Sequence, residues 1–253
     1  MAESVNPFAS KIYKKISRQV GLAIESYKLI NENDRILIGL SGGKDSVILT
    51  HILHEFQRKA PIKFELEVVT FNPQFAEFNI KAIAEYAAKQ NWKHTIKTLN
   101  VAEIIEEKNF SDNPCVLCSR LRRGLLYQTA EELKCNKLAL GHHADDAIIS
   151  FMMSYFRGQG LSSMAPNVPG DNGKLRIIRP LVLTAESWIA EFAEFFELPS
   201  GTKCKYDKFL AENGDREYFK QMLETLEKKI PNFRSNALKS MSNIQKDFLF
   251  QKT

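Results

Sequence analysis

The stretch that most constrains the fold is residues 35–46, Arg-Ile-Leu-Ile-Gly-Leu-Ser-Gly-Gly-Lys-Asp-Ser, where an apolar run stops at a glycine pair and a helical pattern begins. Residues 36–40 are almost all apolar, which is typical of a parallel strand buried on both faces. Gly42 and Gly43 allow a tight turn that exposes backbone N–H groups, and the helix after them has a partial positive charge at its N-terminus. The stretch is therefore an anion site, and phosphate is the expected anion.

The spacing of the glycines excludes two well-known phosphate loops. A Walker-type loop needs Gly where this chain has Ile38, and Ser or Thr where it has Asp45. The dinucleotide fingerprint G-x-G-x-x-G is also missing. Ser-Gly-Gly-Lys-Asp-Ser instead resembles the PP-loop of the ATP pyrophosphatase family, whose members split ATP between its α- and β-phosphates and put AMP on a substrate oxygen; an ordinary glycine turn is the alternative. By this resemblance ATP is held by Ser41, Gly42, Gly43, Lys44, Asp45 and Ser46.

Composition limits the classes of protein to which this chain can belong. The hydrophobic fraction of 44% and the charged fraction of 26% are ordinary for a globular chain of 253 residues. No run approaches the roughly 18 apolar residues of a membrane helix, and the first residues lack the apolar core of a signal peptide, so we expect a cytoplasmic protein without a membrane partner. Four cysteines in such a chain favour metal or redox chemistry over disulfides. A net charge of +5 permits a nucleic-acid partner without establishing one.

Strand patterns alternate with helix patterns after an amphipathic helix over residues 7–30, whose basic flank is either solvated or an RNA contact. This alternation predicts an α/β fold with a doubly wound, mainly parallel five-stranded sheet, whose ligands lie beyond the carboxyl ends of the strands. A long loop is expected over residues 158–173. We place a boundary near residue 198, between an ATP-binding domain (residues 1–198) and a helical, basic extension (residues 199–253). The expected strands are residues 36–40, 64–71, 94–99, 138–140 and 175–179.

Two cysteines lie three residues apart where a helix is expected to begin. At this spacing the sulfurs of Cys115 and Cys118 can point the same way, and a helix N-terminus favours thiolates. The pair fits a metal site, a redox couple or half of a zinc site, and the pattern alone does not choose among them. Cys135, just before an expected strand, is interpreted as structural.

A polar cluster follows the fourth expected strand. Gly141 ends that strand at the edge where the phosphate loop is expected, so Gly141 and His142 are candidates for nucleotide contact. Carboxylates beside a triphosphate are unfavourable unless a divalent cation lies between them, so Asp45 together with Asp145 or Asp146 is expected to bind Mg²⁺. Capping of the following helix is the alternative for Asp146.

Three motifs in order narrow the resemblance to the tRNA 2-thiocytidine synthetase (TtcA) subfamily of PP-loop proteins. They are Cys-Val-Leu-Cys-Ser-Arg-Leu-Arg-Arg-Gly at 115–124, Leu-Gly-His-His-Ala-Asp-Asp at 140–146 and Arg-Pro-Leu at 179–181. The resemblance implies a [4Fe–4S] cluster on Cys115, Cys118 and Cys204, although this chain has a single cysteine where the subfamily commonly has a second Cys-x-x-Cys. It also implies catalytic roles for Lys44, Asp45 and Asp145, with Mg²⁺ on Asp45 and Asp146.

The same resemblance implies an enzyme, an ATP-dependent tRNA sulfurtransferase. It would adenylate the C2 oxygen of a cytidine in the tRNA anticodon loop and then insert sulfur to give 2-thiocytidine. The implied partners are tRNA, a sulfur donor such as a cysteine desulfurase, and a second copy in a homodimer. Two alternatives are a tRNA ligase of the lysidine-synthetase type, which does not need the cysteines, and a non-enzymatic paralogue that binds ATP or RNA. Residues that flank the cysteines and could contact the tRNA backbone, or could simply be solvated, are Arg120, Arg122, Arg123, Lys203, Lys205 and Lys208.

Overall fold

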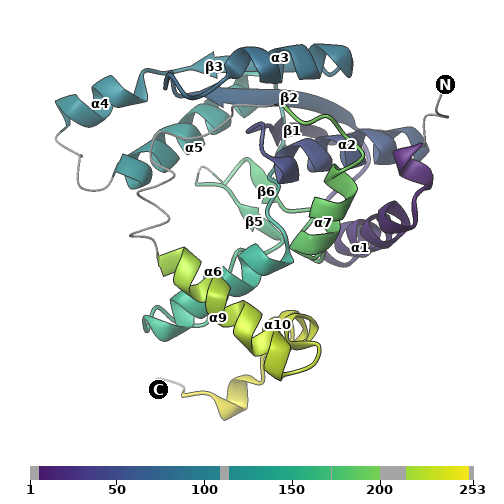
Figure 1. Ribbon diagram of the computed structural model, residues 1–253, viewed down its shortest axis with the longest axis vertical. Coiled ribbons are helices and arrows are strands. Elements are labelled where there is room, and N and C mark those ends of the chain that lie inside the picture. The colour runs from purple at the N-terminus through teal and green to yellow at the C-terminus, as the bar shows by residue number, and fades with distance from the viewer. Residues whose placement is uncertain (1–5, 109–113, 172, 200–214, 251–253) are drawn as a thin grey trace.

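The computed structural model describes residues 6–108, 114–171, 173–199 and 215–250. A six-stranded sheet lies at the centre of the α/β part, in the order β3-β2-β1-β4-β6-β5 (Figure 1). Five strands run parallel, and β5 pairs antiparallel with β6 at one edge. The strands are β1 (Arg35–Gly39), β2 (Glu65–Asn72), β3 (His94–Thr98), β4 (Lys137–Ala139), β5 (Asn167–Pro169) and β6 (Arg176–Ile178).

The predicted doubly wound, mainly parallel sheet is confirmed, and all five predicted strands are present. The sheet has one strand more than predicted, because β5 lies in the stretch expected to be a loop. Its three residues show no alternating pattern and end in Pro169, which lacks the N–H that an inner strand needs. Such a short edge strand exists only because β6 offers it a partner, with Val168 opposite Ile177.

Helices cover the sheet on both sides. The helix between β2 and β3 begins at Ile80, because the Asn79 side chain accepts a hydrogen bond from Ala82 N at 3.1 Å and caps the helix there. The helices are α1 (Lys11–Tyr27), α2 (Lys44–Lys59), α3 (Ile80–Lys89), α4 (Val101–Glu107), α5 (Pro114–Glu132), α6 (Ala144–Phe156), α7 (Glu186–Ala193), α9 (Asp215–Lys229) and α10 (Phe233–Met241), with 3-10 turns at Pro7–Ala9 and Lys246–Phe248.

Strand β1 is buried on both faces, as its apolar sequence predicts. Ile36 and Ile38 pack into the larger core with α1, α2 and α7, whereas Leu37 points the other way, into a second core with α5. Strands β2 and β3 lie on one side of β1, and β4 and β6 lie on the other side. The direction in which successive strands are added to the sheet therefore reverses at β1. A crevice at such a reversal, beyond the carboxyl ends of the strands, is where α/β sheets of this kind bind ligands.

The helices α9 and α10 pack on α6, at the end of the molecule opposite β3 and α3 (Figure 1). Phe219 and Leu223 of α9 are buried against Ile148 and Met152 of α6. The helical character predicted for the C-terminal part is confirmed, while the domain boundary at residue 198 stays a prediction. Among the described residues, no helix has the length and apolar composition that spanning a membrane requires.

Candidate active site

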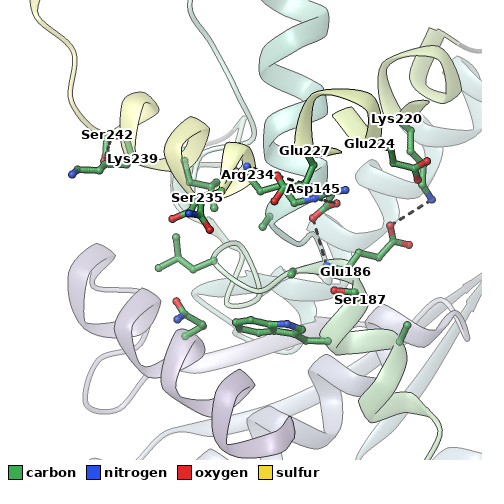
Figure 2. Close-up of a pocket in the computed structure, with 18 of the residues that line it drawn as sticks. Asp145, Glu186, Ser187, Lys220, Glu224, Glu227, Arg234, Ser235, Lys239 and Ser242 are labelled. Carbon is green, nitrogen blue, oxygen red and sulfur yellow. Dashed lines mark hydrogen bonds and ion pairs between the residues drawn. The ribbon is translucent and has the colours of Figure 1, made fainter. Parts of the chain in front are cut away.

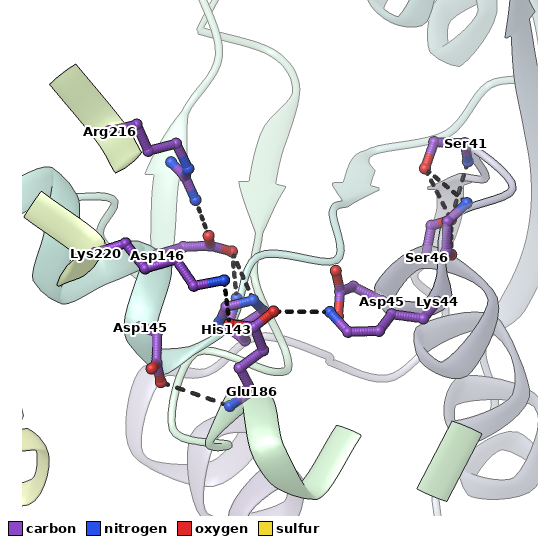
Figure 3. Close-up of polar contacts among 11 residues, drawn as sticks. Ser41, Lys44, Asp45, Ser46, His143, Asp145, Asp146, Glu186, Arg216 and Lys220 are labelled. Atoms are coloured by element: carbon purple, nitrogen blue, oxygen red, sulfur yellow. Dashed lines mark hydrogen bonds and ion pairs between the residues drawn. The ribbon is translucent and has the colours of Figure 1, made fainter. Parts of the chain in front are cut away.

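The loop between β1 and α2 closes on itself through Ser46. The Ser46 hydroxyl donates to Gly43 O at 2.9 Å and accepts from the backbone N of Ser41 at 3.0 Å, and the two serine hydroxyls lie 3.0 Å apart (Figure 3). Gly42 has φ +81°, in the left-handed region that favours glycine. Gly43, at the N-cap position of α2, has no side chain, and no described side chain caps the helix there, so its first N–H groups can bind a ligand. The arrangement is an anion cradle.

Gly141 follows β4, the parallel neighbour of β1, and lies against the start of α2. A Cβ atom on Gly141 would lie 3.0 Å from the carbonyl carbon of Asp45 and 3.1 Å from the backbone N of Ser46. Backbone atoms cannot yield as a flexible side chain can, so only glycine allows β4 to come this close to the start of α2. The structure thus brings together Gly141 and the loop, as predicted.

The Lys44 ammonium lies between two carboxylates. Its Nζ is 2.9 Å from Oδ1 of Asp45 and 3.0 Å from Oε1 of Glu186, the first residue of α7 (Figure 3). Burial by itself would lower the pKa of Lys44, but the two carboxylates outweigh it and the pKa is raised. Lys44 therefore carries a full positive charge at neutral pH beside the cradle.

The C-terminal helices contribute three cations to this region, each on a different carboxylate. Arg234 of α10 places Nε 2.8 Å from Oδ2 of Asp145. On α9, Arg216 pairs with Asp146, and Lys220 Nζ lies 3.4 Å from Oε2 of Glu186. These three ion pairs connect the C-terminal helices to the N-terminus of α6 and to α7.

Asp146 also performs the capping role that the sequence left open. Its Oδ2 accepts a hydrogen bond from the backbone N of His143 at 2.9 Å, and its Oδ1 accepts from Arg216. Both carboxylate oxygens of Asp146 thus accept hydrogen bonds, whereas within the described part of the chain Asp45 makes its one polar side-chain contact through Oδ1, to Lys44. Asp45 therefore suits an added cation better than Asp146 does.

His142 is held by Arg179, the first residue of the Arg-Pro-Leu motif. Arg179 Nε donates to His142 Nδ1 at 3.3 Å, and Arg179 Nη1 donates to the carbonyl of Ala165. Burial, followed by the positive charge of Arg179, lowers the pKa of His142 to about 4. His142 is therefore a neutral hydrogen-bonding group at physiological pH.

Cys115 and Cys118 lie at the start of α5 and are half-buried. Cys135 differs: it is packed with Leu37 and Leu138, and burial raises its pKa to about 11, so it is a structural thiol as predicted. Cys204 lies outside the described residues. Within the described residues, no group of three or more His, Cys, Asp or Glu side chains is arranged to hold a metal ion.

A cavity of about 850 Å³ lies next to Asp145 and Glu186, on the side of the C-terminal helices (Figure 2). Asp145 and Glu186 line one wall, and Arg234 and Lys220 line the wall formed by α10 and α9. Asp145 thus faces this cavity and pairs with Arg234 rather than with Lys44.

A model of the PP-loop domain matches residues 12–206 of the chain. The chain belongs to the PP-loop family. It is 39% identical over 238 residues to the tRNA-cytidine(32) 2-sulfurtransferase of Geobacter sulfurreducens, covering 94% of this chain and 92% of the relative. It is 37% identical over 236 residues to the protein of the same name from Chromohalobacter salexigens, covering 93% and 82%. These relationships confirm the predicted subfamily and the prediction that this PP-loop protein is an enzyme, a sulfurtransferase.

A solved structure shares the fold of this PP-loop chain. It is the U34-tRNA thiolase NcsA from Methanococcus maripaludis with its [4Fe-4S] cluster, with a TM-score of 0.71 and 23% identity. The match covers 91% of this chain and 78% of that one. At this identity the likeness supports the fold.

The sequence did not single out four charged residues of the site: Glu186, Arg216, Lys220 and Arg234. Glu186 follows the Arg-Pro-Leu motif closely and opens a helix, where a carboxylate is favoured by the helix dipole. The helix dipole explains why an acidic residue stands at position 186, but it does not predict that this residue contacts Lys44. The three basic residues lie on helices whose charge pattern is that of an ordinary solvated face.

Proposed function

We propose that this chain transfers sulfur to a cytidine of tRNA, with ATP as the activating substrate. The observation that carries the proposal is the cradle of Ser41, Gly42, Gly43 and Ser46 with the Lys44 ammonium beside it, in a chain related over nearly its full length to tRNA-cytidine(32) 2-sulfurtransferases. The anion cradle fits the phosphates of ATP.

The reaction needs activation because the C2 oxygen of cytosine is a very poor leaving group. That oxygen attacks the α-phosphorus of ATP, so an O–P bond forms, the bond from the α-phosphorus to the bridging oxygen breaks, and pyrophosphate leaves. Sulfide then attacks C2, forms the C–S bond and expels AMP with the former C2 oxygen. In the first step the loop amides and Lys44 stabilise the charge that develops on the phosphates.

Magnesium fits Asp45 in this scheme. Mg²⁺ is usually held by one or two carboxylates together with substrate phosphates, and Asp45 is half-exposed at the start of α2. Asp146 would join as a ligand only after Arg216 leaves its carboxylate. Asp145, the third carboxylate considered for magnesium, is paired with Arg234. In this scheme its role is to position the N-terminus of α6.

The cysteines would hold an iron–sulfur cluster. Two half-buried sulfurs at i and i+3 on the first turn of α5 suit cluster ligation, and Cys204 is the proposed third ligand. When bound, a cluster held by three cysteines has one iron without a protein ligand, where a sulfide can be held. The residues of α5 that follow the cysteines, Arg120, Arg122 and Arg123, would contact tRNA phosphates. We also propose a cytoplasmic homodimer that receives sulfur from a donor such as a cysteine desulfurase.

Mass analysis of tRNA nucleosides tests the proposal. Cells without the gene should lack 2-thiocytidine, and the wild-type gene should restore it, whereas a Lys44→Ala gene should not. With purified, anaerobically loaded protein, tRNA should stimulate pyrophosphate release from ATP. Unchanged 2-thiocytidine in cells without the gene would contradict the proposal. Formation of a lysine adduct of cytidine instead would identify the lysidine-type ligase.

A further inference from the structure

We propose that Glu186 is a positioning residue for the PP-loop lysine: its carboxylate fixes the direction of the Lys44 ammonium at the start of α2. This inference deepens the proposed function and rests on it. It concerns a residue of α7 that belongs neither to the loop nor to the cysteine and histidine motifs.

The Lys44 ammonium, at the start of α2, contacts a carboxylate from a distant part of the chain. Lys44 Nζ lies 3.0 Å from Oε1 of Glu186, a residue 142 positions later. The other carboxylate on this ammonium, Asp45, is the next residue in the chain. Adjacent residues on a helix point in different directions, so Asp45 by itself does not fix the direction of the lysine. Figure 3 shows the ammonium directed towards Glu186 and away from Ser41.

Glu186 is itself held in place from three sides. Its Oε2 lies 3.4 Å from Lys220 Nζ, and its backbone N donates to Oδ1 of Asp145 at 3.5 Å. One and two turns along α7, Ile189 and Phe192 are fully buried in the core that includes α2. Because α7 packs against the helix that carries Lys44, the position of Glu186 relative to the loop is fixed by the core.

The charge of Glu186 suits this task. Burial would raise the pKa of Glu186, but the hydrogen bond from Lys44 and the charges of Lys44, Lys220 and His143 outweigh it and lower the pKa to about 2. Glu186 is therefore ionised throughout the physiological range, and it contributes to the raised pKa of Lys44. A glutamine at this place would keep the shape and an acceptor oxygen but would lose the charge.

The inference predicts an effect of Glu186 that a neighbouring carboxylate does not share. Glu191→Gln is the matched control, because it removes an exposed carboxylate of the same helix.

The test compares the kcat of the reaction with the affinity for ATP. In the anaerobically loaded enzyme with tRNA, Glu186→Asp should reduce the kcat of pyrophosphate release at least about 10-fold, with the Kd of ATP changed less than about 3-fold, because the shorter side chain no longer reaches the ammonium. Glu191→Gln should match wild type in both. Circular dichroism and thermal unfolding of each variant check that the chain is folded.

Two results would overturn the inference. One is a wild-type kcat in folded Glu186→Asp, and the other is a Kd of ATP that rises as much as kcat falls. Absence of ATP binding by the wild-type chain would instead overturn the proposed function.

Discussion

Arg234 Nε lies 2.8 Å from Oδ2 of Asp145, and this ion pair connects α10 to the first turn of α6. Asp145 is buried, with 8% of its side chain exposed, and Arg234 is 27% exposed. The pair is thus largely withdrawn from water, and each partner depends on the other for compensation of its charge. It connects the C-terminal helices to the residues of the candidate site.

Removal of Arg234 should therefore destabilise the protein. Arg234→Met leaves the carboxylate of Asp145 buried without its cation, and we expect the free energy of unfolding to fall by about 2–4 kcal/mol. Urea denaturation followed by circular dichroism measures it. Lys239→Met, at an exposed position of the same helix, is the control and should change stability by less than about 0.5 kcal/mol. Equal effects of the two substitutions would mean that the ion pair contributes nothing.

Gly141 should not tolerate a side chain. In Gly141→Ala the new Cβ would press on the backbone of Asp45 and Ser46, so β4 and α2 must move apart, at a cost of about 1–3 kcal/mol. We expect ATP affinity to fall at least about 10-fold, measured by equilibrium dialysis. Gly124→Ala is the matched control, because a Cβ at that helical position has open space around it and alanine favours a helix. ATP binding of Gly141→Ala at wild-type strength would contradict this account of the cradle.

Iron content should depend on two of the described cysteines and not on the third. After anaerobic reconstitution, Cys115→Ser and Cys118→Ser should each lose most of the bound iron and of the absorbance near 400 nm that is roughly typical of iron–sulfur clusters. Cys135→Ser is the control and should keep both, because that thiol is packed in the core. Cys204→Ser tests the proposed third ligand in the same way. Full iron content in Cys115→Ser would exclude that residue as a ligand.

Acid should destabilise the fold through buried histidines. His51 stacks on Phe196 with ring centroids 4.2 Å apart and lies 2.7 Å from the Tyr86 hydroxyl. Burial, followed by the charge of His54, lowers the pKa of His51 from 6.5 to about 4. Between these values the unfolded chain binds a proton that the folded chain does not, so stability is lost as pH falls below 6.5.

The size of this effect can be isolated with one variant. At pH 5 the contribution of His51 amounts to about 2 kcal/mol, since a tenfold difference in proton affinity corresponds to roughly 1.4 kcal/mol. His51→Phe should reduce the difference in unfolding free energy between pH 7.5 and pH 5 by about that amount, measured by urea denaturation at both values. The wild-type difference persisting in the variant would show that His51 titrates normally. His142, whose pKa is also about 4, accounts for part of the acid sensitivity that remains.

Much of the fold and part of the site could be predicted from local patterns. The glycine pair after an apolar run required a turn, and that turn is the cradle that Ser46 closes. The alternation of strands and helices required a parallel sheet, and parallel strands bring Gly141 to the same edge as the loop. Strand β5 was not predicted, because its pairing with β6 makes it a strand and its own residues show no strand pattern.

The sequence by itself determined the chemistry available at the loop and on α5, because the conformation of a turn and the spacing of two cysteines on a helix depend on neighbouring residues. Only the tertiary structure decided which charges meet. Glu186 reaches Lys44, and Arg216, Lys220 and Arg234 reach three carboxylates, because helices far apart in the chain pack on a common core. Ion pairs of this kind have no fixed spacing along the chain, so no local pattern encodes them.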